Sequence, residues 1–274
     1  MLQRVYYCLL LIVPKKIMEL LGLCFFAFLA GFIDSMVGGG GLIQLPALFI
    51  FFPDISIAAL FGTNKLASIC GTTAAAIHFI KQVKLDFHAV VPTAVTALIF
   101  SFLGARTVSV INSEILRPVV LGLLIVVAIY TFIKKDFGEE YQPRRQNHLV
   151  YYMMLIGGSV GFYDGFFGPG TGSFLIFLLI AVLGFDFIRA SATAKIINWS
   201  TNLAALIYFV FIGKVLYLIA LPMALCNVIG GILGARMAIL KGSAFVRVLF
   251  LIVVSGLIIK LAYDILIKSV VIRM

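Results

Sequence analysis

The chain has 274 residues, of which 63% are hydrophobic and only 12% are charged, and its formal net charge is +10. Soluble domains carry about 25% charged residues, so this composition excludes a soluble globular protein and predicts a polytopic membrane protein. The basic residues are scattered between apolar runs rather than gathered in one stripe. This pattern argues against a nucleic-acid partner and fits loops that face the cytoplasm.

The first half of the chain predicts a short leading segment and four spans. Residues 1–16 have a small apolar core followed by Pro14, Lys15 and Lys16, and we expect them to lie at the membrane interface. The first span, residues 17–37, stops at a run of glycines. The apolar segment 42–52 that follows is too short to span alone, so a broken or re-entrant element is expected there. Further spans are predicted at residues 57–80, 89–110 and 115–133.

The second half repeats this plan. Residues 134–148 are polar and charged, without an apolar helical face, and are predicted to be a cytoplasmic linker. The pattern then restarts with a span at residues 149–167 and a short arm at 173–183. Spans at residues 188–212, 216–238 and 245–267 follow, with a tail at 268–274.

An offset of 130 residues brings the two halves into register. The register holds for Asp34 with Asp164, Thr63 with Thr193, Lys65 with Lys195, Lys84 with Lys214, Pro92 with Pro222 and Arg106 with Arg236. Apolar sequences share Leu and Ala by chance, but they do not readily share Asp, Lys, Pro and Arg at one offset. We therefore predict two four-span repeats, residues 17–133 and 149–267. Internal repeats are the usual construction of secondary transporters.

The orientation depends on how the short arms are counted. If each glycine-broken element is one crossing, an all-α protein of about eight spans results, with parallel repeats and both termini on one side. That side carries the larger share of Lys and Arg, so the termini are predicted to be cytoplasmic. If each short arm crosses the membrane fully, the repeats are inverted and the charge bias disappears.

The glycine breaks predict a ligand site. Non-helical backbone is tolerated within a membrane only inside the protein or beside a wet cavity. The candidate residues at the breaks are Gly38, Gly39, Gly40, Gly41, Gly168, Gly170, Thr171 and Gly172. The helix that restarts after each break points N–H groups and a partial positive charge toward it, which favours an anion. The alternative is a close helix crossing that requires small residues.

Charged residues accompany both breaks. Asp34 and Asp164 could cap the restarting helix, pair with a cation, or carry a proton that couples transport. Lys65 and Lys195 could neutralise an anion or pair with one of these aspartates, unless each extends to the membrane interface.

Uncharged polar groups complete the candidate substrate-binding set. They are Thr63, Asn64, Thr193 and Asn198, on the same spans as the lysines, where Asn202 adds a further hydrogen-bonding group. These side chains either line a path or join one helix to another.

Enzyme and metal chemistry are not expected. His78, His88 and His148 have no metal-ligand spacing, and no known nucleophile, metalloprotease or phosphate-loop pattern occurs. The sequence therefore predicts a non-enzyme without a cofactor.

These motifs resemble those of the sulfite exporter TauE/SafE family of membrane permeases. The resemblance is carried by Gly31–Gly41 with Gly62-Thr63-Asn64-Lys65, and by Gly161–Gly172 with Ala192-Thr193-Ala194-Lys195. It covers residues 18–267. It implies a bacterial inner-membrane permease that moves small sulfur-containing anions such as sulfite, sulfonates or thiosulfate, by export. The second break reads Gly-Pro-Gly-Thr-Gly where the first has four glycines, so the two half-sites differ.

Two other functions remain open at this stage. One is a permease for another small organic anion, and the other is a membrane assembly factor that transports nothing. The expected partners are a small anionic substrate, the lipid bilayer and, as a candidate homodimer, a second copy of the chain.

Overall fold

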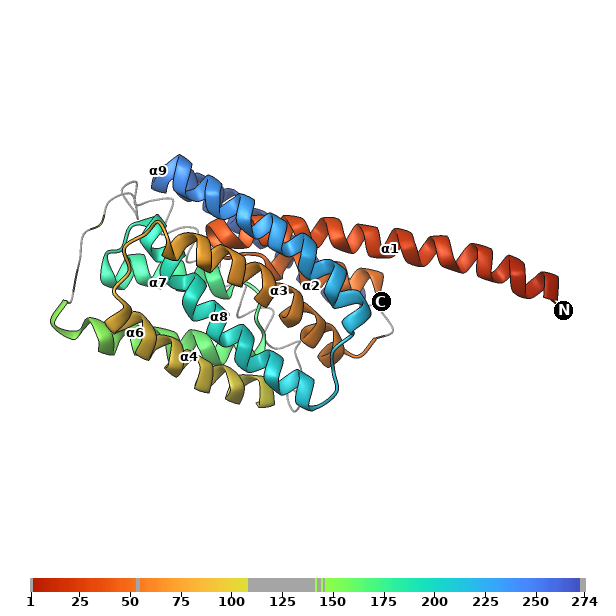
Figure 1. Cartoon of the computed structure of the whole chain (residues 1–274), viewed down its shortest axis with the longest axis horizontal. Helices are drawn as coiled ribbons and strands as arrows, with labels where there is room; N and C mark the ends of the chain where they lie inside the picture. Colours follow the sequence, from red (N-terminus) through yellow and green to blue (C-terminus); the bar gives the residue numbers. More distant parts are fainter. Residues whose placement is uncertain (1, 53–54, 108–140, 142–143, 145, 272–274) are drawn as a thin grey trace.

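The computed structural model describes residues 2–52, 55–107, 141, 144 and 146–271, which are almost entirely helical (Figure 1). The helices are α1 (Leu2–Val37), α2 (Gly41–Phe51), α3 (Ile57–Ile80), α4 (Phe87–Thr107), η1 (Gln146–His148), α6 (Leu149–Phe166), α7 (Thr171–Leu183), α8 (Phe187–Phe211) and α9 (Tyr217–Val271). The all-helical prediction is confirmed for these residues. The predicted span at 115–133 and most of the linker 134–148 lie outside them.

Two helices differ from the predicted segments. α1 includes residues 2–16, so no break separates the predicted interfacial segment from the first span. α9 is interrupted at Gly242, which has non-helical angles of φ 78° and ψ −178°. The two limbs of α9 on either side of Gly242 correspond to the predicted spans at 216–238 and 245–267.

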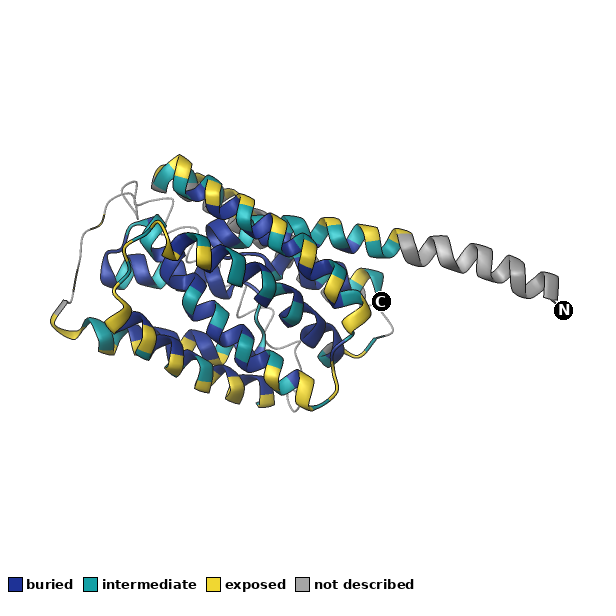
Figure 2. Ribbon diagram, viewed as in Figure 1, coloured by how far each residue is buried: buried dark blue, intermediate teal, exposed yellow. Residues whose placement is uncertain are grey.

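The outer surface is apolar enough to face lipid. Within the described ranges, four helical segments are long and apolar enough to cross a membrane: Met18–Val37, Phe87–Thr107, Phe187–Phe211 and Tyr217–Gly242. Exposed positions follow the outward faces of α4 and α9, while the inward faces are buried (Figure 2). The exposed side chains include Phe211 and Leu218, both 89% exposed. The protein is therefore built as a polytopic membrane protein.

The two short helices return along the helices that precede them. A Cβ built on Gly22 of α1 would lie 2.8 Å from the Phe51 ring at the end of α2. In the second repeat, Arg144 N, before α6, donates to Leu183 O at the end of α7 over 2.9 Å. Each short helix is thus the returning arm of a helical hairpin.

The tips of the two hairpins meet inside the molecule. Ser173 N donates to Gly38 O over 3.1 Å, and Ser173 Oγ donates to Val37 O over 2.8 Å. A Cβ on Gly172 would lie only 2.4 Å from Gly38 Cα. Gly38 has φ +78°, a left-handed conformation that favours glycine. The glycine breaks therefore allow two backbones to touch.

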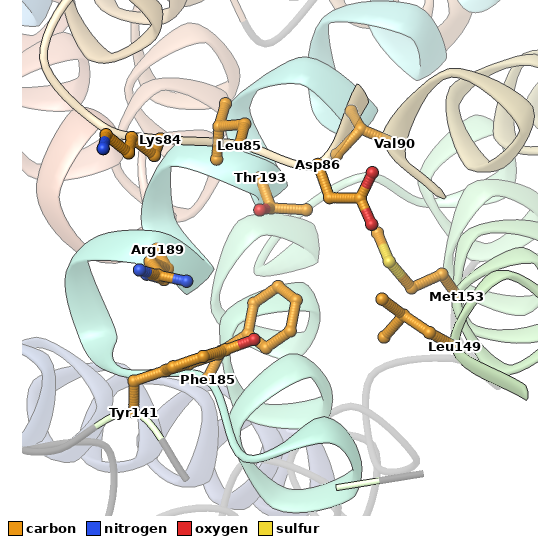
Figure 3. Close-up of a pocket in the computed structure, with 10 residues that line it drawn as sticks. All are labelled: Lys84, Leu85, Asp86, Val90, Tyr141, Leu149, Met153, Phe185, Arg189 and Thr193. Atoms are coloured by element: carbon orange, nitrogen blue, oxygen red, sulfur yellow. The ribbon is translucent and has the colours of Figure 1, made fainter. Parts of the chain in front are cut away.

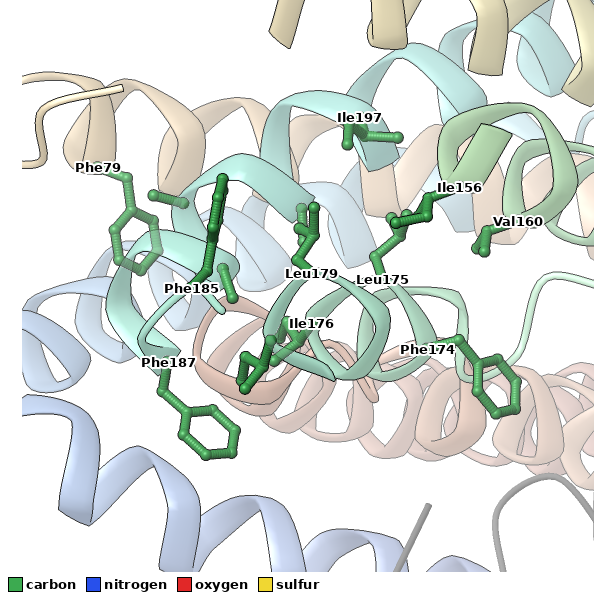
Figure 4. Close-up of a cluster of buried hydrophobic side chains, with 14 of the residues drawn as sticks. Phe79, Ile156, Val160, Phe174, Leu175, Ile176, Leu179, Phe185, Phe187 and Ile197 are labelled. Carbon is green, nitrogen blue, oxygen red and sulfur yellow. The ribbon is translucent and has the colours of Figure 1, made fainter. Parts of the chain in front are cut away.

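The repeats are inverted, and the prediction of parallel repeats is wrong. Leu216 N, which follows α8, donates to Thr63 Oγ1 near the start of α3 over 3.0 Å. At the opposite ends of the same helices, Phe79 and Phe187 belong to one hydrophobic cluster (Figure 4). The equivalent helices α3 and α8 therefore run antiparallel.

Inversion requires an odd number of membrane crossings in each repeat. Hairpins that return the chain to the face it entered from would leave three full crossings per repeat if residues 115–133 span as predicted. An odd number of crossings starts the second repeat from the other face. Lys84 and Lys214 then lie at opposite ends of the α3/α8 pair, so the charge count behind the predicted orientation no longer applies. The cytoplasmic location of the termini stays a prediction.

Glycines also join the repeats to one another. α4 packs against α6, where a Cβ on Gly165 would lie 1.9 Å from Ser101 O. α1 packs against α9 in the same way, where a Cβ on Gly230 would lie 2.1 Å from Phe28 O. Small residues let helix backbones approach closely in membranes. The first helix of each repeat is thereby held by a later helix of the other repeat.

Inversion predicts the labelling of two equivalent connections. With Lys84→Cys and Lys214→Cys as single cysteines in sealed, uniformly oriented vesicles, a membrane-impermeant maleimide should label one from outside and the other only after permeabilisation. Both positions are exposed, so access to the thiol is not limited by burial. Lys81→Cys, on the same connection as Lys84, is the matched control and should label like Lys84→Cys. Labelling of Lys84→Cys and Lys214→Cys from one side would contradict the inverted arrangement.

Candidate functional site

Two buried ion pairs cross between the repeats. Lys65 Nζ on α3 lies 2.6 Å from Asp164 Oδ2 on α6, and Lys195 Nζ on α8 lies 2.6 Å from Asp34 Oδ2 on α1. The side chains of Lys65, Asp164 and Lys195 are 3%, 2% and 0% exposed, whereas Asp34 is 18% exposed. The lysines therefore do not extend to the membrane interface. Each lysine pairs with the aspartate of the opposite repeat.

The aspartates also bind the residues just beyond the breaks. Asp34 Oδ1 accepts a hydrogen bond from Gly40 N over 3.3 Å, and Asp164 Oδ1 accepts one from Thr171 Oγ1 over 2.7 Å. A Cβ on Gly40 would lie 2.6 Å from Asp34 Cβ, so glycine makes room for this contact. Each carboxylate thus joins a lysine, the end of a long helix and the start of a short one.

A small polar cavity lies between the hairpin tips, α3 and α8. Its volume is about 30 Å³, which is room for roughly two water molecules. The lining residues are Asp34, Gly38, Gly41, Asn64, Lys65, Ser68, Asp164, Gly168, Gly170, Thr171, Gly172, Asn198 and Asn202. This cavity is called the central cavity below.

Several donors and acceptors at the central cavity have no partner among the described residues. The N–H groups of Gly41 and Gly172, in the first turns of α2 and α7, donate to no other described residue. Asn64 Oδ1 is buried and also unpartnered. Free N–H groups at a helix N-terminus attract negative charge. Two such termini and Lys65 therefore border one small space, and Lys195 lies beside it through its pair with Asp34.

Comparison with known proteins identifies the family. The family model described as Sulfite exporter TauE/SafE matches residues 23–261. The chain belongs to this family. No solved structure matches this TauE/SafE protein.

Bacterial relatives carry names that agree with a transport function. A protein of Escherichia coli (strain K12) named "Probable membrane transporter protein YfcA" is 36% identical over 246 residues, which are 89% of this chain and 90% of the relative. "Probable membrane transporter protein ORF9" of Sinorhizobium sp. is 35% identical over 238 residues, covering 87% and 90%. A "Probable membrane transporter protein" of Haemophilus influenzae is 32% identical over 237 residues, covering 86% and 92%. The chain is therefore a bacterial membrane transporter of the TauE/SafE type, and it is not an enzyme.

The structure brings most of the predicted residues to the central cavity, but not all. Gly39, Gly40, Thr63, Thr193 and Lys195 are absent from its lining. Lys195 is tied to Asp34, and Gly40 supports the same aspartate. Thr63 binds the connection after α8, and Thr193 lines a different, larger cavity. The role of the lining residues in substrate binding stays a prediction.

One lining residue, Ser68, was not singled out from the sequence. Ser68 and Asn202 lie one helical turn after Asn64 and Asn198, on the same helix faces. Ser68 is also the equivalent of Asn198 at the offset of 130. The repeat register combined with helical spacing could therefore have found Ser68.

Because the two hairpin tips touch, a side chain added at their contact should destabilise the protein. Gly172→Ala should destabilise the protein by about 1–3 kcal/mol, because the new Cβ meets the Gly38 backbone and the core around it is tightly packed. Gly41→Ala is the matched control, since the nearest atom to its Cβ is 3.5 Å away. Thermal unfolding in detergent measures both. Equal melting temperatures for the two variants would contradict the observed contact.

Because Lys65 and Asp164 form a buried ion pair, removing one charge should destabilise the protein more than removing both. Lys65→Met leaves Asp164 buried and uncompensated and should cost about 3–5 kcal/mol. Adding Asp164→Asn removes the remaining charge and should recover most of the lost stability. The measurement is again thermal unfolding in detergent, with all variants at one pH. A double variant as unstable as Lys65→Met would show that the loss comes from packing and not from charge.

Proposed function

We propose that this transporter exports small sulfur-containing anions such as sulfite, sulfonates or thiosulfate, and that it binds them in the central cavity. The observation that carries the proposal is the position of the buried lysines. Lys65 lines the cavity, and Lys195 lies beside it through its pair with Asp34. The sulfur chemistry of the substrate comes from the family to which the chain belongs.

The backbone contributes the remaining anion-binding groups. The free N–H groups of Gly41 and Gly172 lie at the starts of two helices that meet at the cavity. Donors therefore reach the cavity from α2 and α7, and the Lys65 ammonium reaches it from α3. A small oxyanion has oxygens in several directions and can accept from all three. Asn64, Ser68, Asn198 and Asn202 add neutral hydrogen-bonding groups around it.

Protonation of Asp34 or Asp164 would couple anion transport to proton movement. In the observed state each lysine is neutralised by a carboxylate, so no positive charge is left for an anion. Protonation of Asp164 removes its negative charge and leaves the Lys65 ammonium to the substrate. The protein would then take up one proton when one anion binds. Export would carry both in the same direction.

The central cavity is too small for the proposed substrates in this conformation. A volume of about 30 Å³ does not accommodate sulfite or a larger sulfonate. The hairpin tips must therefore separate from α3 and α8 before substrate binds. Rupture of the Lys65–Asp164 pair provides this movement, because the pair holds α3 to α6.

Transport by reconstituted protein tests the proposal. In proteoliposomes, the neutral pair Lys65→Met/Asp164→Asn should lower uptake of sulfite or thiosulfate at least tenfold, because the charge that binds the anion is gone. Thr107→Val, at the exposed end of α4, is the control and should transport normally. A pH-sensitive dye in the lumen should report acidification when the parent protein takes up the anion. Unchanged uptake by the double variant would remove the pair from the mechanism.

Thermal stabilisation separates the substrate alternatives. The parent protein should melt at a higher temperature with sulfite, thiosulfate or sulfoacetate, and the double variant should not. Stabilisation by simple carboxylates alone would indicate a permease for another organic anion. If no anion stabilises the parent and none is transported, the assembly-factor alternative stands.

A further inference from the structure

A second cavity of about 340 Å³ lies at the start of α8 (Figure 3). We call it the vestibule; it is lined by Lys84, Leu85, Asp86, Val90, Tyr141, Leu149, Met153, Phe185, Arg189 and Thr193. Lys84 and Asp86 belong to the connection between α3 and α4, and Thr193 faces the same space from α8 (Figure 3). Thr193 is two residues before Lys195 on α8.

Thr193 has an unsatisfied polar group. Its side chain is 0% exposed, and its Oγ1 makes no hydrogen bond with any described residue. A buried hydroxyl without a partner costs free energy. Threonine in a helix usually donates to the carbonyl four residues earlier, and Thr193 does not do this either. The Thr193 hydroxyl therefore faces the vestibule without a protein partner among the described residues.

The equivalent threonine of the first repeat has that partner. Thr63 Oγ1 donates to Ala59 O over 2.7 Å and accepts from Leu216 N over 3.0 Å. Leu216 comes directly before α9, and its equivalent at the offset of 130 is Asp86, directly before α4. No hydrogen bond joins Asp86 N to Thr193 in the described structure. Two equivalent contacts are thus possible, and only one is made.

The neighbouring residue explains which contact is made. A Cβ on Gly62 would lie 2.0 Å from Lys214 O, so the connection between α8 and α9 rests directly on α3 because Gly62 has no side chain. The equivalent of Gly62 is Ala192, which is fully buried. A methyl group at this position makes the same close approach of the connection between α3 and α4 less favourable than glycine does. The vestibule is the space between this connection and α8.

We propose that Thr63 and Thr193 are the latches of two gates, one on each face of the membrane. Each latch closes its face when the threonine hydroxyl accepts the N–H of the residue before the next helix. In this structure the Thr63 latch is closed, and the Thr193 latch is open over the vestibule. Ala192 in place of glycine biases the resting protein toward this state. The inference rests on the transport function and adds the residues that alternate access between the faces.

Two equivalent cysteine reporters test the latches without any substrate. Leu85→Cys reports on the vestibule, and Val215→Cys reports on the closed face, where Val215 is 9% exposed. The four native cysteines are replaced by alanine in a full-length chain that keeps the thermal stability of the parent. A small polar methanethiosulfonate reagent should modify Leu85→Cys several-fold faster than Val215→Cys.

Substitutions at the latches should then shift the two rates in opposite directions. Thr63→Val removes the closed latch, so Val215→Cys should react several-fold faster and Leu85→Cys more slowly. Ala192→Gly lets the vestibule close, so Leu85→Cys should react several-fold more slowly. Adding Thr193→Val to Ala192→Gly removes the new latch and should restore the rate at Leu85→Cys.

Specific results would overturn the proposal. Rates that do not change with Thr63→Val and Ala192→Gly, in variants with unchanged thermal stability, would show that the threonines do not control access. An Ala192→Gly effect that persists with Thr193→Val would assign the closure to packing and not to the latch. Because these measurements need no anion, they stay separate from the tests of substrate and proton coupling.

Discussion

The two crossed ion pairs constrain the rest of this structure. Each buried charge costs several kcal/mol to remove from water, and a close partner of opposite sign is needed to offset that cost. Here the partner always comes from the other repeat: Lys65 takes Asp164, and Lys195 takes Asp34. The pairs therefore fix both hairpins against α3 and α8. The central cavity is the space that remains where these four parts meet.

Sequence reasoning located the helices well because hydrophobic length is a local property. The span predicted at 57–80 coincides with α3, and the short arm predicted at 173–183 lies within α7. The relative orientation of the two repeats was predicted wrongly because of one short segment of only eleven residues. Its hydrophobicity is the same whether it crosses the membrane or returns, and the return depends on contacts with distant helices. Because the sequence does not show whether this short segment crosses the membrane, the relative orientation of the two repeats was predicted wrongly.

The sequence predicted which charged residues form the site, but not which lysine pairs with which aspartate. Asp34, Asp164, Lys65 and Lys195 stood out because charges are costly in a membrane and because they recur at one offset. Which lysine meets which aspartate follows only from the inversion, and the inversion was missed. Thr63 and Thr193 look identical in sequence. Their environments differ because a neighbouring position is glycine in one repeat and alanine in the other.

The crossed arrangement has a consequence for how the protein is made. Asp164 follows Lys65 by 99 residues, and Lys195 follows Asp34 by 161. When the ribosome has produced only the amino-terminal half, neither of that half's charges has its counterpart. Lys65 and Asp34 must then pair with each other or stay in a hydrated environment until the later helices emerge. Final burial is therefore a late step of biogenesis, and an isolated amino-terminal half cannot complete it.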